Sequence, residues 1–154
     1  MSMFDTMEIS SSGLSAQRLR MKVISSNIAN VNTTRTPGGG PYRRRDTIFA
    51  ALPATKSFQD ELLSQQKDDG VRHVKVVGIT EDGRAPKLKY DPTHPDANEE
   101  GYVELPNIDV VEEMTNMMVA KRSFEANIAA LNATKNMINK ALDIGREIEL
   151  LKVY

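Results

Sequence analysis

The two histidines of the chain, His73 and His94, are the first residues whose type suggests chemistry. His94 lies between Asp91 and Asp96 in the segment DPTHPD, and an imidazole with two carboxylates could bind a metal ion or support hydrolysis. A metal site needs three or four converging ligands, whereas the prolines on both sides of His94 favour an extended backbone. We therefore expect no metal or hydrolytic site there. His73 alternates with valines, which is typical of an ordinary strand residue.

The glycine-rich and basic segments also lack the context of a binding site. The glycines at positions 38–40 are not followed by the Lys-Ser or Lys-Thr pair of a phosphate-binding loop, and no serine-nucleophile signature occurs. The arginines at positions 43–45 belong to a chain of formal net charge −1, whereas nucleic-acid binders usually carry a strong basic excess. The sequence therefore predicts no catalytic residue, cofactor, small-molecule substrate or nucleic-acid partner, and we expect that the protein is not an enzyme.

Composition restricts how the protein is stabilised and where it can reside. The 154-residue chain has no cysteine, so neither a disulfide nor a thiolate–metal framework can form. Its longest uninterrupted apolar run is five residues, 48–52, which is too short for a transmembrane helix or for the apolar part of a secretory signal. We expect a protein that does not span a membrane and that, if it is exported, carries no classical cleaved signal.

Apolar residues recur with a seven-residue rhythm at both ends of the chain. The front seam consists of Met3, Met7, Leu14, Met21, Ile24, Ile28 and Val31, interrupted by Ser10 and Gln17. The back seam consists of Val110, Met114, Met117, Phe124, Ile128, Leu131, Ile138 and Leu142, interrupted by Lys121 and Lys135. Such seams belong to helices that pack along their length against other helices. They predict a protein that assembles rather than catalyses.

A second stripe on the back helix is rich in small residues. It consists of Val119, Ala126, Ala130, Ala133, Met137, Ala141, Ile144, Ile148 and Leu151. Small side chains would let another helix approach closely, but a broad core-facing stripe of a single helix would show the same pattern. Both interpretations remain open on the sequence alone.

Three regions follow from these patterns. Residues 1–36 form the N-terminal helix, expected at about 3–32, and its exit. Residues 37–107 form a loop and a small β-rich insert, and residues 108–154 form a long C-terminal helix capped by Asn107 or Asp109. The insert is expected to contain an extended segment at 42–52, a short helix at 57–66, a strand at 71–79, a hairpin turn at Asp82-Gly83 with a return strand at 85–90, a loop at 91–101 and an extended segment at 102–105. The expected fold class is mainly α, with the two long terminal helices paired as an antiparallel coiled coil.

Several segments resemble bacterial flagellar rod and hook proteins. The segment SGLSAQ at 12–17, followed by NIAN at 27–30, resembles the N-terminal signature that these proteins share. The residues that carry this motif are Gly13, Leu14, Ala16, Gln17, Asn27, Ile28, Ala29 and Asn30. ANVNTTRTPGGGPYRRRD at 29–46, DPTHPDANEEGYVELPNIDVVEEM at 91–114 and KRSFEANIAALNATKNMINKAL at 121–142 are similar to the proximal-rod branch of this family. The apolar tail at 146–154 departs from the family by its length.

This resemblance implies a structural subunit of the flagellar basal-body rod, the drive shaft that crosses the periplasm and transmits torque. It implies export through the flagellar type III apparatus without cleavage, and assembly with other rod proteins and basal-body components. It further implies that the terminal helices pair into a coiled coil that packs against neighbouring subunits, with the insert on the outside. The alternative function is a soluble helical-hairpin adaptor or regulatory protein.

Two asparagines near the end of the front helix are expected to position the chain rather than to catalyse. The amides of Asn27 and Asn30 can cap backbone groups and bridge to the loop at 33–36. Simple exposure with local turn formation is the alternative for this pair.

Overall fold

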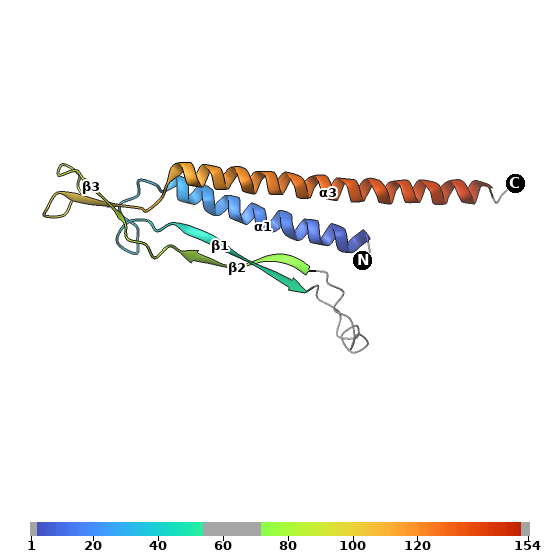
Figure 1. The fold of residues 1–154 in the computed structure, drawn as a ribbon, viewed down its shortest axis with the longest axis horizontal. Coiled ribbons are helices and arrows are strands. Elements are labelled where there is room, and N and C mark those ends of the chain that lie inside the picture. The colour runs from blue at the N-terminus through green and yellow to red at the C-terminus, as the bar shows by residue number, and fades with distance from the viewer. Residues whose placement is uncertain (1–2, 54–71, 152–154) are drawn as a thin grey trace.

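Two helices and two small antiparallel sheets form the part of the chain that the structure describes, residues 3–53 and 72–151 of a computed structural model. In chain order the elements are α1 Met3–Ala29, β1 Arg45–Pro53, β2 Arg72–Glu81, β3 Lys87–Tyr90, β4 Tyr102–Leu105 and α3 Val110–Leu151. Figure 1 shows an elongated molecule in which α3 is the longest element and projects beyond the start of α1. The short helix expected at 57–66 lies outside the described residues.

The front helix ends three residues earlier than the sequence suggested. We expected it to reach residue 32, but α1 ends at Ala29. The amide of Asn30 bonds both the Ser26 carbonyl (3.1 Å) and the Asn27 carbonyl (3.2 Å), and the amide of Thr33 bonds the Asn30 carbonyl (3.1 Å). These tighter turns end the helix, because the short polar side chain of Asn30 also competes for a backbone carbonyl of the last helical turn.

The helices α1 and α3 lie side by side and run in opposite directions (Figure 1). Near the end of α1, Asn27 bonds Glu113 at the start of α3, whereas the earlier Gly13 lies against Asn127. Small residues are among those buried on the two helices: Ser10 and Ala16 of α1 are each 5% exposed, and Ala120 of α3 is 0% exposed. Small side chains let the two backbones approach closely over the length of α1.

The contact within the chain uses only half of the predicted back seam. Met117, Phe124, Leu131 and Ile138 are half-buried, but Val110, Met114, Ile128 and Leu142 are exposed. The residues just before Met114, Lys121, Ile128 and Lys135 face α1 instead. They are Glu113, Ala120, Asn127 and Thr134. This displaced frame has a physical reason: it leaves Lys121 and Lys135 in solvent and places small or hydrogen-bonded residues where the helices are closest. In the front seam, Ile24 is buried and the other described members are half-buried.

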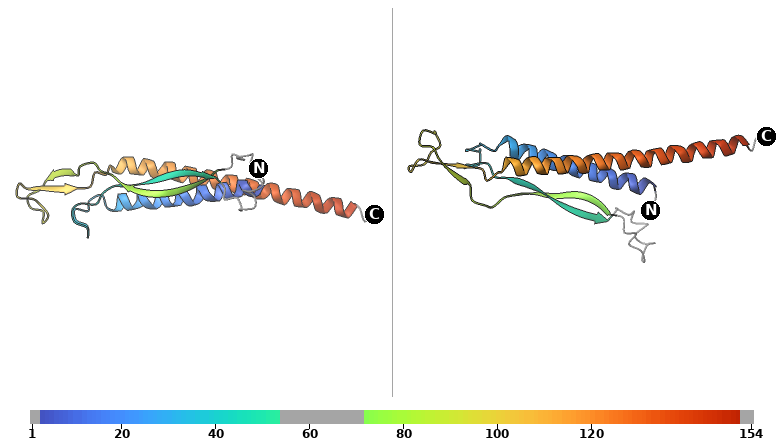
Figure 2. Two further views of the ribbon diagram at one scale, coloured as in Figure 1. Left: turned by 90° about the horizontal axis from the view of Figure 1, so that it is seen from below. Right: turned by 45° about the horizontal axis from the view of Figure 1, so that its top comes forward.

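The sheet of β1 and β2 covers the side of α1 that faces away from α3, so that α1 forms a middle layer (Figures 1 and 2). Arg45 pairs with Glu81 and Pro53 with Arg72, and the register shifts between Ile48 and Phe49. The hydroxyl of Ser12 on α1 accepts a hydrogen bond from the amide of Val74 (3.2 Å). Serine is a weaker helix former than alanine, but Ser12 contributes to the contact of α1 with the sheet.

The expected hairpin around Asp82-Gly83 is wrong, because β2 pairs with β1 and β3 pairs with β4. The Asp82 carboxylate accepts hydrogen bonds from the amide of Arg84 (2.9 Å) and from its Nε (2.7 Å), and the amide of Asp82 bonds the Arg44 carbonyl (2.8 Å). The Arg84 side chain holds the pKa of Asp82 down at about 2. This local turn redirects the chain toward β3 instead of reversing it onto β2.

The sheet of β3 and β4 lies at the end of the molecule opposite both termini (Figure 1). The prolines around His94 suggested an extended loop between the two strands, but the loop is not extended. It is a series of turns in which the amide of His94 bonds the Asp91 carbonyl (3.2 Å) and that of Ala97 bonds the His94 carbonyl (3.0 Å). Gly101 closes the loop with φ of +83°, a conformation that favours glycine.

Candidate assembly site

A buried polar cluster joins the end of α1, the start of β1 and the start of α3. We call it the polar junction; its residues are Asn27, Tyr42, Arg44 and Glu113. The Nδ2 of Asn27 donates to the carbonyl of Arg45 (2.8 Å) and to Oε2 of Glu113 (2.8 Å). Its Oδ1 accepts from the amide of Arg45 (3.0 Å) and from the Tyr42 hydroxyl (3.1 Å). Asn27 thus forms hydrogen bonds with both the amide and the carbonyl of Arg45, as the backbone of a neighbouring β-strand would.

The carboxylate of Glu113 is neutralised inside the polar junction by Arg44. The Glu113 Oε1 lies 2.8 Å from both Nε and Nη2 of Arg44, and Arg44 Nη1 lies 3.3 Å from Asp46. The side chain of Glu113 is 1% exposed and that of Arg44 is 14% exposed. Burial alone would lower the pKa of Arg44, but the hydrogen bond and charge of Glu113, together with Asp46, raise it above its ordinary value. Arg44 therefore stays charged, and removing either member of the ion pair would leave a buried group without its partner.

The polar junction connects helices and a strand rather than binding a substrate, because its polar groups form hydrogen bonds with one another and with the backbone of Arg45. Glu113 comes from α3, Asn27 from α1, and Tyr42 and Arg44 from the segment that leads into β1. These contacts connect residues 86 positions apart in the chain and set where α3 begins along α1. A fully bonded buried polar cluster is well suited to fixing one register between two helices.

The family-motif residues lie mostly along the contacts of α1. An added Cβ at Gly13 would lie 3.0 Å from Asn127 Oδ1, and Ala16 is 5% exposed. Asn30 donates to the Ser26 carbonyl (2.8 Å) and accepts from the Thr33 hydroxyl (3.1 Å), so it bridges to the following loop. Leu14, Gln17 and Ile28 are half-buried, whereas Ala29 is exposed. The positional role of these residues in assembly stays a prediction.

Sequence reasoning did not identify Tyr42, Arg44 or Glu113 as members of a site. One signal was available for Arg44, because alternation along an extended strand turns the middle one of three arginines to the opposite side from its neighbours. In the structure Arg43 and Arg45 are exposed and Arg44 points inward. No comparable pattern marked Glu113, whose partners come from distant parts of the chain.

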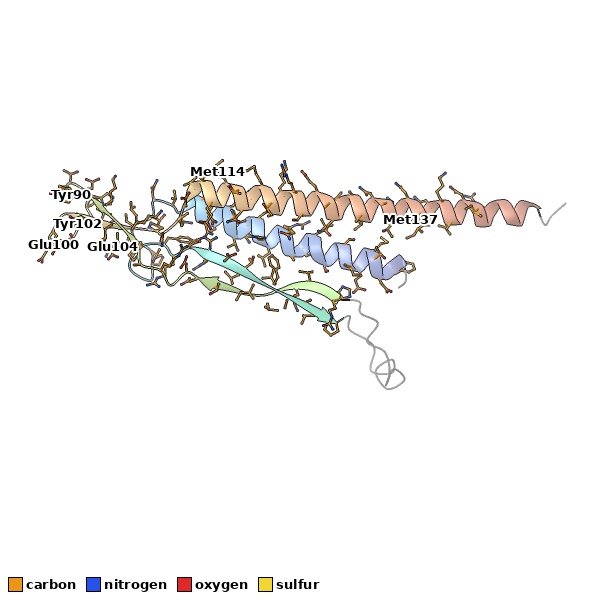
Figure 3. All side chains as sticks on the ribbon, in the orientation of Figure 1. Tyr90, Glu100, Tyr102, Glu104, Met114 and Met137 are labelled. Carbon is orange, nitrogen blue, oxygen red and sulfur yellow. The ribbon has the colours of Figure 1, made fainter. Side chains whose placement is uncertain are left out.

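Two exposed stripes on α3 flank the face that contacts α1. The lysine stripe repeats every seven residues and consists of Met114, Lys121, Ile128, Lys135 and Leu142. The alanine stripe consists of Val119, Ala126, Ala130, Ala133, Met137, Ala141 and Ile144. Met114 and Met137, which Figure 3 labels on α3, are 56% and 55% exposed. A long helix with apolar residues exposed on two further sides has room for additional helical neighbours.

The segment around His94 shows a local turn. The His94 Nδ1 accepts a hydrogen bond from the amide of Asp96 (3.1 Å), and Asp91 bonds the hydroxyl of Thr93 (2.9 Å). Among the described residues, no three His, Asp or Glu side chains are grouped in a way that could hold a metal ion. Within the same part of the chain, no helix combines the length and apolar character needed to cross a membrane.

Comparison with known proteins places both ends of the chain in one group. Residues 7–35 match the family model described as flagella basal body rod protein, and residues 99–144 match the one described as flagellar basal body rod FlgEFG protein C-terminal. The flagellar basal-body rod protein FlgC of Borreliella burgdorferi is 46% identical over 94% of this chain and 98% of its own length. FlgC of Bacillus subtilis is 46% identical, and that of Salmonella typhimurium 38% identical, each over 95% of this chain and 100% of its own length.

Proposed function

Because the chain belongs to the FlgC family of flagellar basal-body rod proteins and is a structural subunit of the rod, we propose how its elements build that rod. The observation that carries the proposal is the pair of exposed stripes on α3. One face of α3 already contacts α1, and the alanine stripe and the lysine stripe remain available to neighbouring subunits. In the rod, the paired helices α1 and α3 of one subunit would pack beside those of other subunits and form a wall of helices.

In this proposal α1 and α3 form an antiparallel coiled coil that lines the wall of the drive shaft. Residues 1–36 and 108–154 supply the two helices, and residues 37–107 form the insert on the outside. The close spacing at Gly13 and the bonded polar junction support a rigid pair, which suits a shaft that transmits torque. The front seam and the half-buried residues of the back seam hold the pair together.

The exposed half of the back seam is assigned to contacts between subunits. Val110, Met114, Ile128 and Leu142 are 38%, 56%, 38% and 62% exposed, respectively. Met114, Ile128 and Leu142 recur at multiples of seven residues, and Val110 lies about one helical turn before Met114, so the four side chains follow one side of α3. Their partners are neighbouring subunits of the basal-body rod.

Family membership supports a proposal for the export route and the location of the subunit. The subunit passes through the flagellar type III apparatus without a cleaved signal and joins the rod in the periplasm. Its role is structural, it uses no cofactor, and it is not an enzyme. The curated relatives are themselves rod proteins by name.

The proposal is tested by placing a carboxylate in the exposed seam. Ile128→Asp should abolish incorporation into basal bodies and motility, because a carboxylate in an apolar contact costs several kcal/mol unless it is paired. Asn136→Asp, at an exposed polar position of α3, is the matched control and should assemble normally. Basal bodies are isolated and probed for the chain, and normal rods with Ile128→Asp would refute the assignment of this seam.

A further inference from the structure

The sheet of β3 and β4 presents an exposed aromatic face that the assembly described above does not use. Tyr90 pairs with Tyr102 and Leu88 pairs with Glu104, so these four side chains share one side of the two-stranded sheet. We call Leu88, Tyr90, Tyr102 and Glu104 the aromatic face. Leu88 is 63% exposed, Tyr90 64% and Tyr102 39%. The two tyrosine rings meet edge to face, with centroids 5.3 Å apart (Figure 3).

The opposite side of the same sheet is engaged within the chain. Val103 is 2% exposed, Lys87 donates to the Ile108 carbonyl (3.0 Å), and Lys89 lies 3.7 Å from Asp91. The lysines thus lie on the same side of the sheet as the buried Val103, and the aromatic face lies on the other side. A two-stranded sheet is only marginally stable when one apolar face is left in water, and exposed aromatic residues are typical of binding surfaces.

The carboxylate of Glu104 is accessible to a long side chain of a partner. Glu104 lines two clefts, of about 310 and 380 Å³, that separate the sheet from the glycine-rich turn before β1. The neighbouring arginines Arg84 and Arg35 are held by Asp82 and Asp96. A partner that fits the aromatic face would present apolar side chains to the tyrosines and a lysine ammonium group to Glu104, all on one side of its surface.

The lysine stripe of α3 has this composition. Apolar and basic residues alternate along it every seven residues, from Met114 through Lys121, Ile128 and Lys135 to Leu142. Ile128 would pack on the tyrosines, and Lys121 or Lys135, seven residues away on either side, would reach Glu104 or a ring face. Most of this stripe lies far along α3 from the sheet of the same molecule, which projects from the other end (Figure 1).

We propose that the aromatic face of one copy of this chain docks on the lysine stripe of a second copy, an inference that rests on the proposed rod function. The two surfaces differ, so the contact is heterologous: each copy keeps a free face and a free stripe after one contact forms. Repeated contacts of this kind produce an open helical arrangement, as a rod requires. The sheet of β3 and β4 of one subunit thereby packs against α3 of the next subunit.

Cross-linking tests the contact directly, because the chain contains no cysteine. Tyr90→Cys is combined in turn with Lys121→Cys, Ile128→Cys or Lys135→Cys. Each double variant is the only version of this subunit that the cells produce, and their basal bodies are isolated and oxidised. At least one pair should give a ladder of cross-linked copies. Tyr90→Cys with Ser25→Cys, an exposed position on α1, is the control and should give none.

Charge reversal provides a second measurement that does not depend on cysteine geometry. Glu104→Lys should lower the yield of isolated rods, and combining it with Lys121→Glu or Lys135→Glu should restore most of the loss. Intact basal bodies that contain the chain, but show neither a ladder nor this rescue, would overturn the contact and leave the rod function standing. Cross-links to a different rod subunit, with none between copies, would also overturn it. Absence of the unmodified chain from basal bodies would instead overturn the proposed function.

Discussion

At the scale of single residues, the polar junction shows why particular side-chain types are needed. The amide of Asn27 both donates to and accepts from the backbone of Arg45, while its second donor position reaches Glu113. An aspartate has the same shape but no donor, and a glutamine is one methylene longer. Glu113, in turn, is tolerated at 0% exposure only because Arg44 and Asn27 bond its oxygens.

Replacing Asn27 by aspartate tests this cluster with almost no change in volume. Asn27→Asp would set two carboxylates about 2.8 Å apart, where Asn27 now donates to Glu113. An uncompensated buried charge costs about 3–5 kcal/mol, so we expect severe loss of basal bodies per cell, counted by electron microscopy. Glu113→Gln in the same chain should restore part of the loss, because its amide can donate to the new carboxylate.

The control for Asn27→Asp is Asn132→Asp, which makes the same chemical change at an exposed position of α3. It should leave the number of basal bodies unchanged. Normal rods with Asn27→Asp would show that the junction does not fix the helices.

At the scale of elements, the seven-residue rhythm located both terminal helices, but it could not tell which apolar residues meet α1. Met117 and Phe124 are half-buried, whereas Met114 and Ile128 are exposed. A helix that contacts several neighbours is apolar on several sides, so spacing alone does not separate contacts within the chain from contacts between chains. The extended segment expected at 42–52 and the strand expected at 71–79 overlap β1 and β2, but the pairing of these two strands was not expected. That pairing depends on hydrogen bonds between distant residues, such as that of Asp82 with Arg44.

The close approach of α1 and α3 leads to a prediction at Gly13. In an open helix, alanine is more favourable than glycine by about 1 kcal/mol. Here an added Cβ would lie 3.0 Å from Asn127 Oδ1, and the Asn127 side chain is itself held by a hydrogen bond to the Ser123 carbonyl (2.9 Å). We therefore expect Gly13→Ala to lower the temperature at which isolated basal bodies dissociate.

A second substitution separates this clash from a general effect on the helix. Gly13→Ala with Asn127→Ala removes the contacting side chain and should recover the dissociation temperature. Ser11→Ala, at an exposed position of α1, should be neutral. If Gly13→Ala alone raised the dissociation temperature, the contact with Asn127 would not limit the helix spacing.

At the scale of the whole molecule, the subunit is long, and it leaves much apolar surface uncovered. The exposed large apolar residues extend over both sheets and along α3, from Ile48 and Val77 to Leu142 and Ile144. Most helical stability in proteins comes from packing of an apolar face, and here part of that packing awaits neighbours. The fold is therefore expected to be complete only in the rod.

The free subunit is expected to hold its terminal helices weakly. The sequence SSSG at 10–13 weakens α1, and α3 extends beyond the contact with α1 (Figure 1). We expect low protection from amide hydrogen exchange across residues 114–142 in a dilute monomer, and high protection of the same residues in isolated basal bodies. Strong protection in the monomer would indicate a stable free-standing helical hairpin, as an adaptor protein would have.

An electron-microscopy map of the assembled rod, with this chain traced in it, would show which surfaces of α3 meet neighbouring subunits. We expect α1 and α3 of each copy to run antiparallel in the wall of the rod. We also expect Ile128, Leu142 and the alanine stripe to be buried between subunits. A rod in which these side chains face solvent, or in which the contacts between subunits are made without α3, would contradict this arrangement.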